Sequence, residues 1–412
     1  MIAGLPATAQ SNYVNFEGKQ TTPVRLSADG NTLFAVNTAD GRLSVFDVSH
    51  PSSPALVAEI PVGLEPVSVN PRTTDEVWVV NEVSDSVSVL SLSKRLVTDT
   101  LYVQDEPADV VFAGGKAFVS AGRRNQVAVF DQTNHSQVAS IPLFGTDPRA
   151  MAVSVDGAKV YAALALSGNH TTQIPAGTAS NQPAPTNLSL PAPPKVSAIV
   201  DASDPAWTNV IHYRMPDNDV AEIDVSSSTV SRYFTNVGTV LLGLAVRPDN
   251  GDLYVANTDA RNLVRFEPVL RGHLVDNRVT RIDHSSGART FYDLNPGVDY
   301  SSASNLVALA NALAQPAGIV FTPDGASFYV AAFGSDLVGH LDNSGNILAR
   351  IEIGNAPASP MPKRKRQTAM DSALQVRAVA EVKRLHQVTM KASARRGPIR
   401  SPSHPPGIWN SA

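Results

Sequence analysis

The chain has 412 residues, a formal net charge of −4, 43% apolar residues, 17% charged residues and no cysteine. A chain without cysteine has no disulfide bond, no cysteine-ligated zinc and no covalently attached c-type haem. The apolar fraction suffices for a large core, while no run approaches the roughly 18 apolar residues that a membrane-spanning helix needs.

The charge is divided unevenly along the chain. From Asn355 onward the sequence holds 11 of the 33 Lys and Arg residues but only 2 of the 37 Asp and Glu residues, so this tail carries +9 and the rest −13. Because binding to a phosphate backbone needs a basic face, the acidic body argues against nucleic acid as its ligand.

Residues 1–12 have some features of a secretory signal. Ala7-Thr8-Ala9 fits the small-x-small cleavage pattern, but the basic region and most of the apolar region of a signal are missing. We therefore expect either the remnant of a signal peptide or a plain polar terminus.

A repeat of four short strands begins after the alternating segment Tyr13–Phe16. Its first four copies start at Pro23, Pro66, Pro107 and Pro148, which are 43, 41 and 41 residues apart. Two further copies follow, and the last, Pro316–Gly354, shows its four strands without interruption. A period near 40–45 residues with four strands indicates a β-propeller blade.

The sequence thus predicts an all-β propeller with six recognisable four-stranded blades over residues 13–354 and a basic, non-propeller tail over residues 355–412. We expect the tail to be disordered or partly helical. Blade six already has an outermost strand, so Tyr13–Phe16 is left without a blade to complete, and a seventh blade is missing or incomplete. A frameshift or a mispredicted gene end after about residue 355 would explain this.

The repeats resemble the YVTN-repeat family of bacterial propellers, which is related to the lactonase-like seven-bladed propellers. The similarity rests on Ser27-Ala28-Asp29-Gly30, on Arg247-Pro248-Asp249-Asn250-Gly251 with Leu253-Tyr254-Val255-Ala256-Asn257, and on Pro323-Asp324-Gly325 with Phe328-Tyr329-Val330. The Gly-His and Trp-Asp marks of WD40 repeats are absent. The resemblance implies seven blades and a periplasmic or secreted protein, and its bearing on function is weak because propellers host many activities.

Aspartates close the third strand of most blades. They are Asp47, Asp131, Asp224, Asp283 and Asp342. Asp and Gly supply the hydrogen bonding and positive φ that tight turns need. Since these residues recur from blade to blade, we interpret them as structural.

Three insertions interrupt the repeats, over residues 166–219, 258–278 and 295–315. Each falls between strands two and three of a blade or between two blades, and these connections emerge on the same face. We therefore predict that the three insertions contact one another over one rim of the channel, above blades four to six.

The second insertion is rich in groups that can bind a ligand. They are Asp259, Arg261, Arg265, Glu267, Arg271, His273 and Asp276. Arginines of such a loop can bind a carboxylate or phosphate, and His273 can serve as a base or metal ligand. The alternative is that Arg–carboxylate pairs, with Arg278 among them, merely hold the loop to the rim.

The other two insertions carry weaker signals. Asp217 and Asp219 at the end of the proline-rich first insertion are candidate calcium ligands, although the EF-hand pattern is absent and a plain turn is the alternative. In the third insertion, Ala303–Gln315 predicts a short helix with Leu306, Leu309 and Leu313 in the core.

Two functions remain open on this reading. The first is an extracytoplasmic binding or scaffold protein, which we expect to be a monomer that takes a protein or a small anionic ligand at the rim. The second is a lactonase-like hydrolase or a propeller associated with electron transfer. No convincing acid–base set is present, so an enzyme is the less favoured interpretation, and no cofactor is assigned.

Overall fold

The computed structural model describes residues 20–50, 53–178, 189, 198–214, 216–264, 270–301, 305–335 and 337–352. The signal-like residues 1–12, the segment Tyr13–Phe16 and the tail 355–412 lie outside the described residues. What the sequence predicts for them, including the frameshift, stays a prediction.

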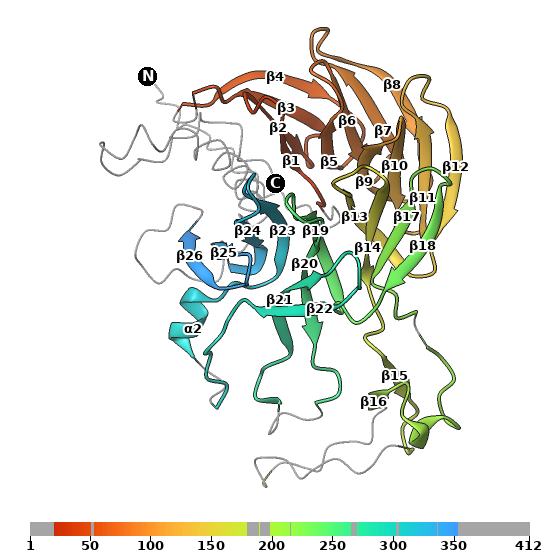
Figure 1. The fold of residues 1–412 in the computed structure, drawn as a ribbon, viewed down its shortest axis with the longest axis vertical. Coiled ribbons are helices and arrows are strands. Elements are labelled where there is room, and N and C mark those ends of the chain that lie inside the picture. Colours follow the sequence, from red (N-terminus) through yellow and green to blue (C-terminus); the bar gives the residue numbers. More distant parts are fainter. Residues whose placement is uncertain are drawn as a thin grey trace, which may run out of the picture.

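Six four-stranded blades follow one another in chain order, from red to blue in Figure 1. Blade one consists of β1 (Val24–Leu26), β2 (Thr32–Asn37), β3 (Arg42–Asp47) and β4 (Ala55–Pro61). Blade two consists of β5 (Pro66–Pro71), β6 (Glu76–Asn81), β7 (Ser86–Ser91) and β8 (Leu96–Tyr102). Blade three consists of β9 (Pro107–Ala113), β10 (Lys116–Ala121), β11 (Gln126–Asp131) and β12 (Gln137–Pro142). Blade four consists of β13 (Thr146–Val153), β14 (Lys159–Leu166), β17 (Val220–Asp224) and β18 (Thr229–Phe234). Blade five consists of β19 (Val240–Val246), β20 (Leu253–Ala260), β21 (Val275–Ile282) and β22 (Arg289–Asp293), and blade six of β23 (Pro316–Phe321), β24 (Ser327–Ala332), β25 (Leu337–Asp342) and β26 (Ile347–Glu352).

The strands are antiparallel throughout, as in Val24↔Ala35 and Thr32↔Asp47 of blade one. Blades four and five also meet through the pair Leu166↔Val240. The predicted all-β propeller with six four-stranded blades is therefore confirmed.

Each inner blade is apolar on both faces because it packs between two neighbours. In β6, Trp78 packs in a core shared with blade three, while Val77 packs in a core shared with blade one, as the alternation of a strand requires. The two end blades differ. Leu33 of blade one and Tyr329 of blade six belong to clusters from their own blade only, and within the described residues no core cluster joins these two blades.

We call the two ends of the channel the loop face and the turn face. The loop face carries the connections from strand two to strand three and from one blade to the next. The turn face carries the short turns between strands one and two and between strands three and four. The first insertion extends from the loop face as the hairpin β15 (Thr171–Ile174) and β16 (Ala198–Asp201), followed by the 3-10 turn η1 (Pro205–Trp207), in the lower part of Figure 1.

Four innermost strands start with the same unusual backbone on the loop face. The residue before the first proline, Glu65, Glu106, Asp147 or Gln315, has a positive φ of 51 to 58°. The carbonyl of Glu65 then accepts a hydrogen bond from the backbone N–H of Glu82 at 2.9 Å.

The repeated aspartates at the ends of the third strands are structural, as predicted. Asp131 Oδ1 accepts hydrogen bonds from the backbone N–H groups of Thr133 and Asn134 at 2.8 and 3.0 Å. Asp283 binds the N–H groups of Ser285 and Ser286 in the same way. These bonds hold the turns to strand four.

The prediction for the helix in the third insertion is partly wrong. The helix α2 (Leu306–Asn311) has only six residues, capped by Asn305, and Leu306 and Leu309 are 75% and 72% exposed. The chain leaves the helix at Ala312 in an extended conformation. Leu313 alone enters the core between blades five and six, because a helix of fewer than two turns cannot direct all three leucines inward.

Candidate functional site

The second insertion contacts each of the other two on the loop face. Asn169 Nδ2 of the first donates to the carbonyl of Ala260 in the second at 3.3 Å. Arg271 Nη1 of the second donates to the carbonyl of Ser301 in the third at 3.2 Å. The predicted contacts are confirmed for these two pairs of insertions.

His273 is the centre of the junction between the second and third insertions. Arg261 Nη1 lies 3.2 Å from His273 Nδ1, and Asp276 Oδ1 lies 2.6 Å from His273 Nε2. The imidazole ring stacks on Tyr300 of the third insertion. Because a guanidinium only donates, the Arg261 contact needs a lone pair on Nδ1, which leaves the ring proton on Nε2. Among the described residues Nε2 makes no hydrogen bond, although Asp276 lies close to it.

Burial of the Tyr300 phenol raises its pKa, and the nearby carboxylates of Asp293 and Asp276 act in the same direction. The Tyr300 phenol is therefore neutral where it stacks on the imidazole ring of His273. This arrangement joins the two insertions through a flat, partly buried contact.

Asp259 belongs to a different group, around Arg278. The second insertion is shorter than predicted, because β20 runs to Ala260 and β21 begins at Val275, so Asp259 and Arg278 lie on strands. Arg278 Nη1 donates to Asp259 Oδ2 at 2.8 Å, and Nη2 donates to the carbonyl of Val237 at 2.9 Å. Burial lowers the pKa of Arg278, against the opposing effect of Asp259.

The structure thus brings together Arg261, His273 and Asp276, but not Asp259 or Arg271. Arg265 and Glu267 lie outside the described residues. The ion pair of Arg278 with Asp259 is of the kind that the loop-holding alternative predicts, whereas Arg271 binds a backbone carbonyl. Sequence reasoning did not single out Tyr300, although it lies within the third insertion.

The two candidate calcium ligands face different partners. Asp217 Oδ1 accepts a hydrogen bond from the backbone N–H of His170 at 2.7 Å. Asp219 is almost fully buried, and its Oδ2 accepts from the N–H of Val237 at 2.5 Å. Burial raises the pKa of Asp219. Among the described residues, no three His, Cys, Asp or Glu side chains are grouped so that they could hold a metal ion.

A buried aspartate near the channel axis was also not singled out from the sequence. Asp109 of β9 is fully buried and accepts hydrogen bonds from Thr22 Oγ1, Ser68 Oγ and Asn70 Nδ2, at 3.1, 2.5 and 3.1 Å. The backbone N–H of Met151 donates to it at 3.0 Å. One carboxylate therefore holds together the innermost segments of blades one to four. The sequence feature that could have revealed Asp109 is a charged residue within the otherwise apolar strand Pro107–Ala113.

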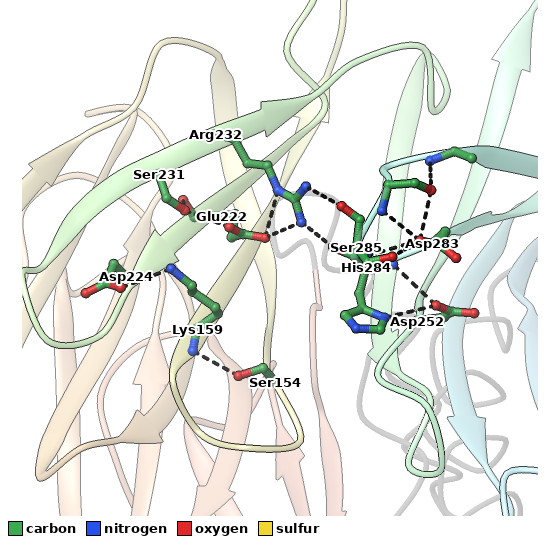
Figure 2. A network of polar contacts seen from close by, with 12 residues as sticks. Ser154, Lys159, Glu222, Asp224, Ser231, Arg232, Asp252, Asp283, His284 and Ser285 are labelled. Carbon is green, nitrogen blue, oxygen red and sulfur yellow. Dashed lines mark hydrogen bonds and ion pairs between the residues drawn. The ribbon is translucent and has the colours of Figure 1, made fainter.

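A second polar network links blades four and five and is drawn in Figure 2. Arg232 Nε donates to Glu222 Oε2 at 2.9 Å, and the same guanidinium donates to the backbone carbonyls of His284 and Ser285. His284 Nδ1 lies 3.3 Å from the buried Asp252. The partners of Arg232 come from strands of blade four and a turn of blade five, so we interpret this network as an inter-blade contact.

Exposed apolar side chains gather on the loop face. In the described parts of the chain, eleven large apolar residues outside strands are exposed. Only Val155 among them lies on the turn face. The ten on the loop face are Leu64, Val83, Phe144, Tyr213, Leu263, Leu274, Tyr300, Leu306, Val307 and Leu309. The last seven belong to the three insertions. Exposed apolar groups rimmed by polar residues mark interaction surfaces.

Comparisons with known proteins show the fold but not a family. No protein-family model matches the chain, and no curated protein matches it in sequence. Among solved structures, it is similar to Kuenenia stuttgartiensis hydrazine synthase, with a TM-score of 0.61, 20% sequence identity, and 85% of this chain and 91% of that chain covered.

Two other solved structures are similar at lower scores. One is a functionally unknown protein from Desulfotomaculum acetoxidans, with a TM-score of 0.52, 11% identity and coverage of 81% and 86%. The other is a putative 6-phosphogluconolactonase from Bacteroides uniformis, with a TM-score of 0.51, 13% identity and coverage of 80% and 85%. At these identities the likeness establishes a β-propeller and no activity.

Among the described residues, no helix is both long enough and apolar enough to cross a bilayer.

Proposed function

We propose that this chain is an extracytoplasmic binding or scaffold protein of the YVTN-repeat type, and that its loop face over blades four to six receives a protein partner. The observation that carries the proposal is the group of exposed apolar side chains on the insertions. On α2, Leu306, Val307 and Leu309 are adjacent and each more than 70% exposed. Leaving such side chains in water costs free energy that a partner surface would recover.

The geometry of His273 supports binding over hydrolysis. Both ring nitrogens already face side chains of the same cluster, Arg261 on Nδ1 and Asp276 on Nε2. A general base needs a lone pair within reach of the substrate. The Nδ1 lone pair is taken by Arg261, so the lactonase-like alternative has no prepared base at this position.

The arginines of the rim also favour a protein over a small anion. Arg271 binds the carbonyl of Ser301, and Arg278 binds Asp259 and Val237. An anion at Arg278 would have to displace these partners, whereas an apolar protein surface can pack on the leucines without doing so. A periplasmic or secreted location is part of the proposal and rests on the YVTN resemblance.

Site-specific photo-crosslinking in cells that produce the full chain tests the proposal. A photo-reactive residue at Val307 should capture one protein, whereas the same residue at Val138, exposed on the outer strand β12, should not. Leu309→Asp should lower the yield at Val307 about tenfold, the effect of losing one buried apolar contact. Equal capture at both positions would refute a loop-face partner. Turnover of a lactone or ester by the purified chain would favour the hydrolase instead.

A further inference from the structure

The channel holds a cavity of about 580 Å³ on the side of the turn face. Most of its wall comes from the innermost strands, and Pro71, Pro248 and Pro323 line it at or just after the ends of three of them. Among the described blades, only blade six also contributes residues of its second strand, Tyr329 and Ala331. The cavity therefore extends farther into blade six than into the other described blades.

Tyr329 and Ala331 lie on the face of blade six that is turned away from blade five. In β24, Phe328 and Val330 pack in the core shared with blade five. Because side chains alternate along a strand, Tyr329 and Ala331 point to the opposite face, where they belong to a cluster from blade six only. Val24 also lines the cavity, and its cluster comes from blade one only. The cavity thus reaches both end blades on the faces where, within the described residues, no core joins them.

Tyr329 carries a hydroxyl group that lacks a partner. The residue is only 8% exposed, and among the described residues no hydrogen bond reaches its hydroxyl. Burial alone raises the pKa of Tyr329, so the phenol is neutral at pH 7. A buried hydroxyl without a partner costs free energy, which a ligand that bonds to it would recover.

The other hydroxyl and amide side chains of the described wall already have partners. Thr22 Oγ1 and Asn70 Nδ2 donate to the buried Asp109 carboxylate at 3.1 Å each. Thr322 Oγ1 donates to a carboxylate within its own turn. Tyr329 therefore provides the one unpaired hydroxyl in the part of the wall that the structure describes.

The ring of Tyr329 is held in place by its neighbours on blade six. It stacks on His340, with the ring centroids 4.4 Å apart and the planes 10° from parallel. His340 Nε2 in turn lies 3.0 Å from Ser327 Oγ. A phenolic O–H is a stronger donor than acceptor, because the ring draws electron density from the oxygen. A carbonyl oxygen is therefore the group that complements this position.

We propose that this cavity binds a small neutral molecule whose carbonyl oxygen accepts a hydrogen bond from the Tyr329 hydroxyl and whose apolar body packs against Val24, Val320 and Ala331. The volume lies within the usual range of small-molecule sites, about 300–1,000 Å³. No Asp or Glu side chain lines the described wall, so a cationic ligand would lack a counter-charge there. This site is separate from the partner surface on the loop face and does not depend on it.

Two matched fluorescent probes test the proposal on the full chain. Prodan is a neutral naphthalene with a ketone, and its propyl analogue has a methylene in place of the carbonyl. Tyr329→Phe removes the hydroxyl and keeps the ring on His340. It should weaken prodan binding by about three- to tenfold, the effect of losing one neutral hydrogen bond, and shift the emission of bound prodan to shorter wavelength. Binding of the propyl analogue should change by less than about twofold. Equal loss for both probes, or no loss, would overturn the assignment of Tyr329.

Tyr102→Phe is the matched control for the loss of a hydroxyl. Tyr102 is 65% exposed at the end of the outer strand β8, far from the innermost strands of the wall. This variant should bind both probes as the parent chain does. A loss of prodan binding equal to that of Tyr329→Phe would refute the site.

Ala331→Leu tests the site independently of the hydroxyl. Filling the cavity beside Tyr329 should weaken binding of both probes at least about tenfold, while the native melting transition is retained. Leu306→Asp with Leu309→Asp is the control, because these residues lie on the loop face. Binding that survives Ala331→Leu, or disappears in the loop-face control, would place the probes elsewhere and refute the cavity site. Absence of saturable prodan binding to the parent chain would refute it as well.

Discussion

The rings of His273 and Tyr300 lie 5° from parallel with their centroids 3.7 Å apart. The two residues come from different insertions, so their stack links the second and third insertions on the loop face, as the Arg271 contact with Ser301 also does. Its strength determines whether these insertions behave as one surface.

Tyr300→Ala should loosen this surface without unfolding the propeller. Losing an aromatic pair removes about 0.5–1.5 kcal/mol beyond buried area, which is enough to raise local opening several-fold. Hydrogen exchange of the amides near residues 272–276 should accelerate, and that of β10 should not. Tyr213→Ala, at a residue 70% exposed on the first insertion, is the control. Unchanged exchange in Tyr300→Ala would show that the stack does not couple the insertions.

Arg278 and Arg271 should differ in their effect on stability. Arg278→Ala removes a partly buried guanidinium and leaves Asp259 and the Val237 carbonyl without this donor, so we expect a loss of about 2–4 kcal/mol in the free energy of unfolding. Arg271 is exposed and donates a hydrogen bond to the carbonyl of Ser301, so Arg271→Ala should cost less than about 0.5 kcal/mol. Chemical denaturation of the two variants measures both. A large loss for Arg271→Ala would mean that this residue holds the loop.

Asp109→Ala should be among the most destabilising substitutions in the channel. It leaves the buried donors of Ser68, Asn70 and Met151 without an acceptor, and each such group costs about 1–3 kcal/mol. We expect a total loss of at least about 3 kcal/mol, measured by denaturation. Asp40→Ala, which breaks an exposed pair with Arg42, should stay within about 0.5 kcal/mol. Similar effects for both variants would contradict the role of Asp109.

Asp219 should lower stability at neutral pH. Burial raises its pKa in the folded state, so the folded protein binds this proton more tightly than the unfolded chain does. Stability attributable to the group therefore falls as pH rises from the unfolded pKa through the folded one. Asp219→Asn should melt higher than the parent protein near pH 7, and the difference should shrink toward about pH 4.

Asp224 is the matched control with the opposite sign. Hydrogen bonds from Ser226 and the backbone of Ser227 lower its pKa in the folded state. The group therefore stabilises the fold above the unfolded pKa and loses that effect as pH falls. Asp224→Asn should melt lower than the parent near pH 7. The same sign for both variants would contradict the assignment for Asp219.

The fold could be predicted from the sequence because each blade repeats local signals. The spacing of Pro23, Pro66, Pro107 and Pro148 marks the blade starts, and the aspartate turns mark the ends of third strands. These signals depend on neighbouring residues in the chain. The contacts among the insertions could also be predicted, because the strand order places the insertions on the same face.

The side-chain arrangement of the loop face could not be predicted in this way. Whether Arg261 meets His273 or Asp259 depends on how far β20 and β21 continue their pairing, which the sequence of the insertion does not reveal. Leu313 is buried and Leu306 is exposed although both fit one helical pattern, because the helix ends between them. The network of Asp109 depends on residues from four blades, and blade three read by itself supplies only the Asp109 carboxylate and none of the donors from the other blades.

The described blades form a series in which each inner blade packs against two neighbours and each end blade against one. The stability of such an array is approximately the sum of the intrinsic stabilities of the blades and the stabilising contributions of the interfaces between them. Opening at an end breaks one interface, whereas opening in the middle breaks two. Amide protons should therefore exchange in a graded order, first in blades one and six and last in blades three and four, where Phe118 and Leu164 share one core. A partner that binds over blades four to six would then change this order of exchange, because it would slow exchange in blade six without contacting the core.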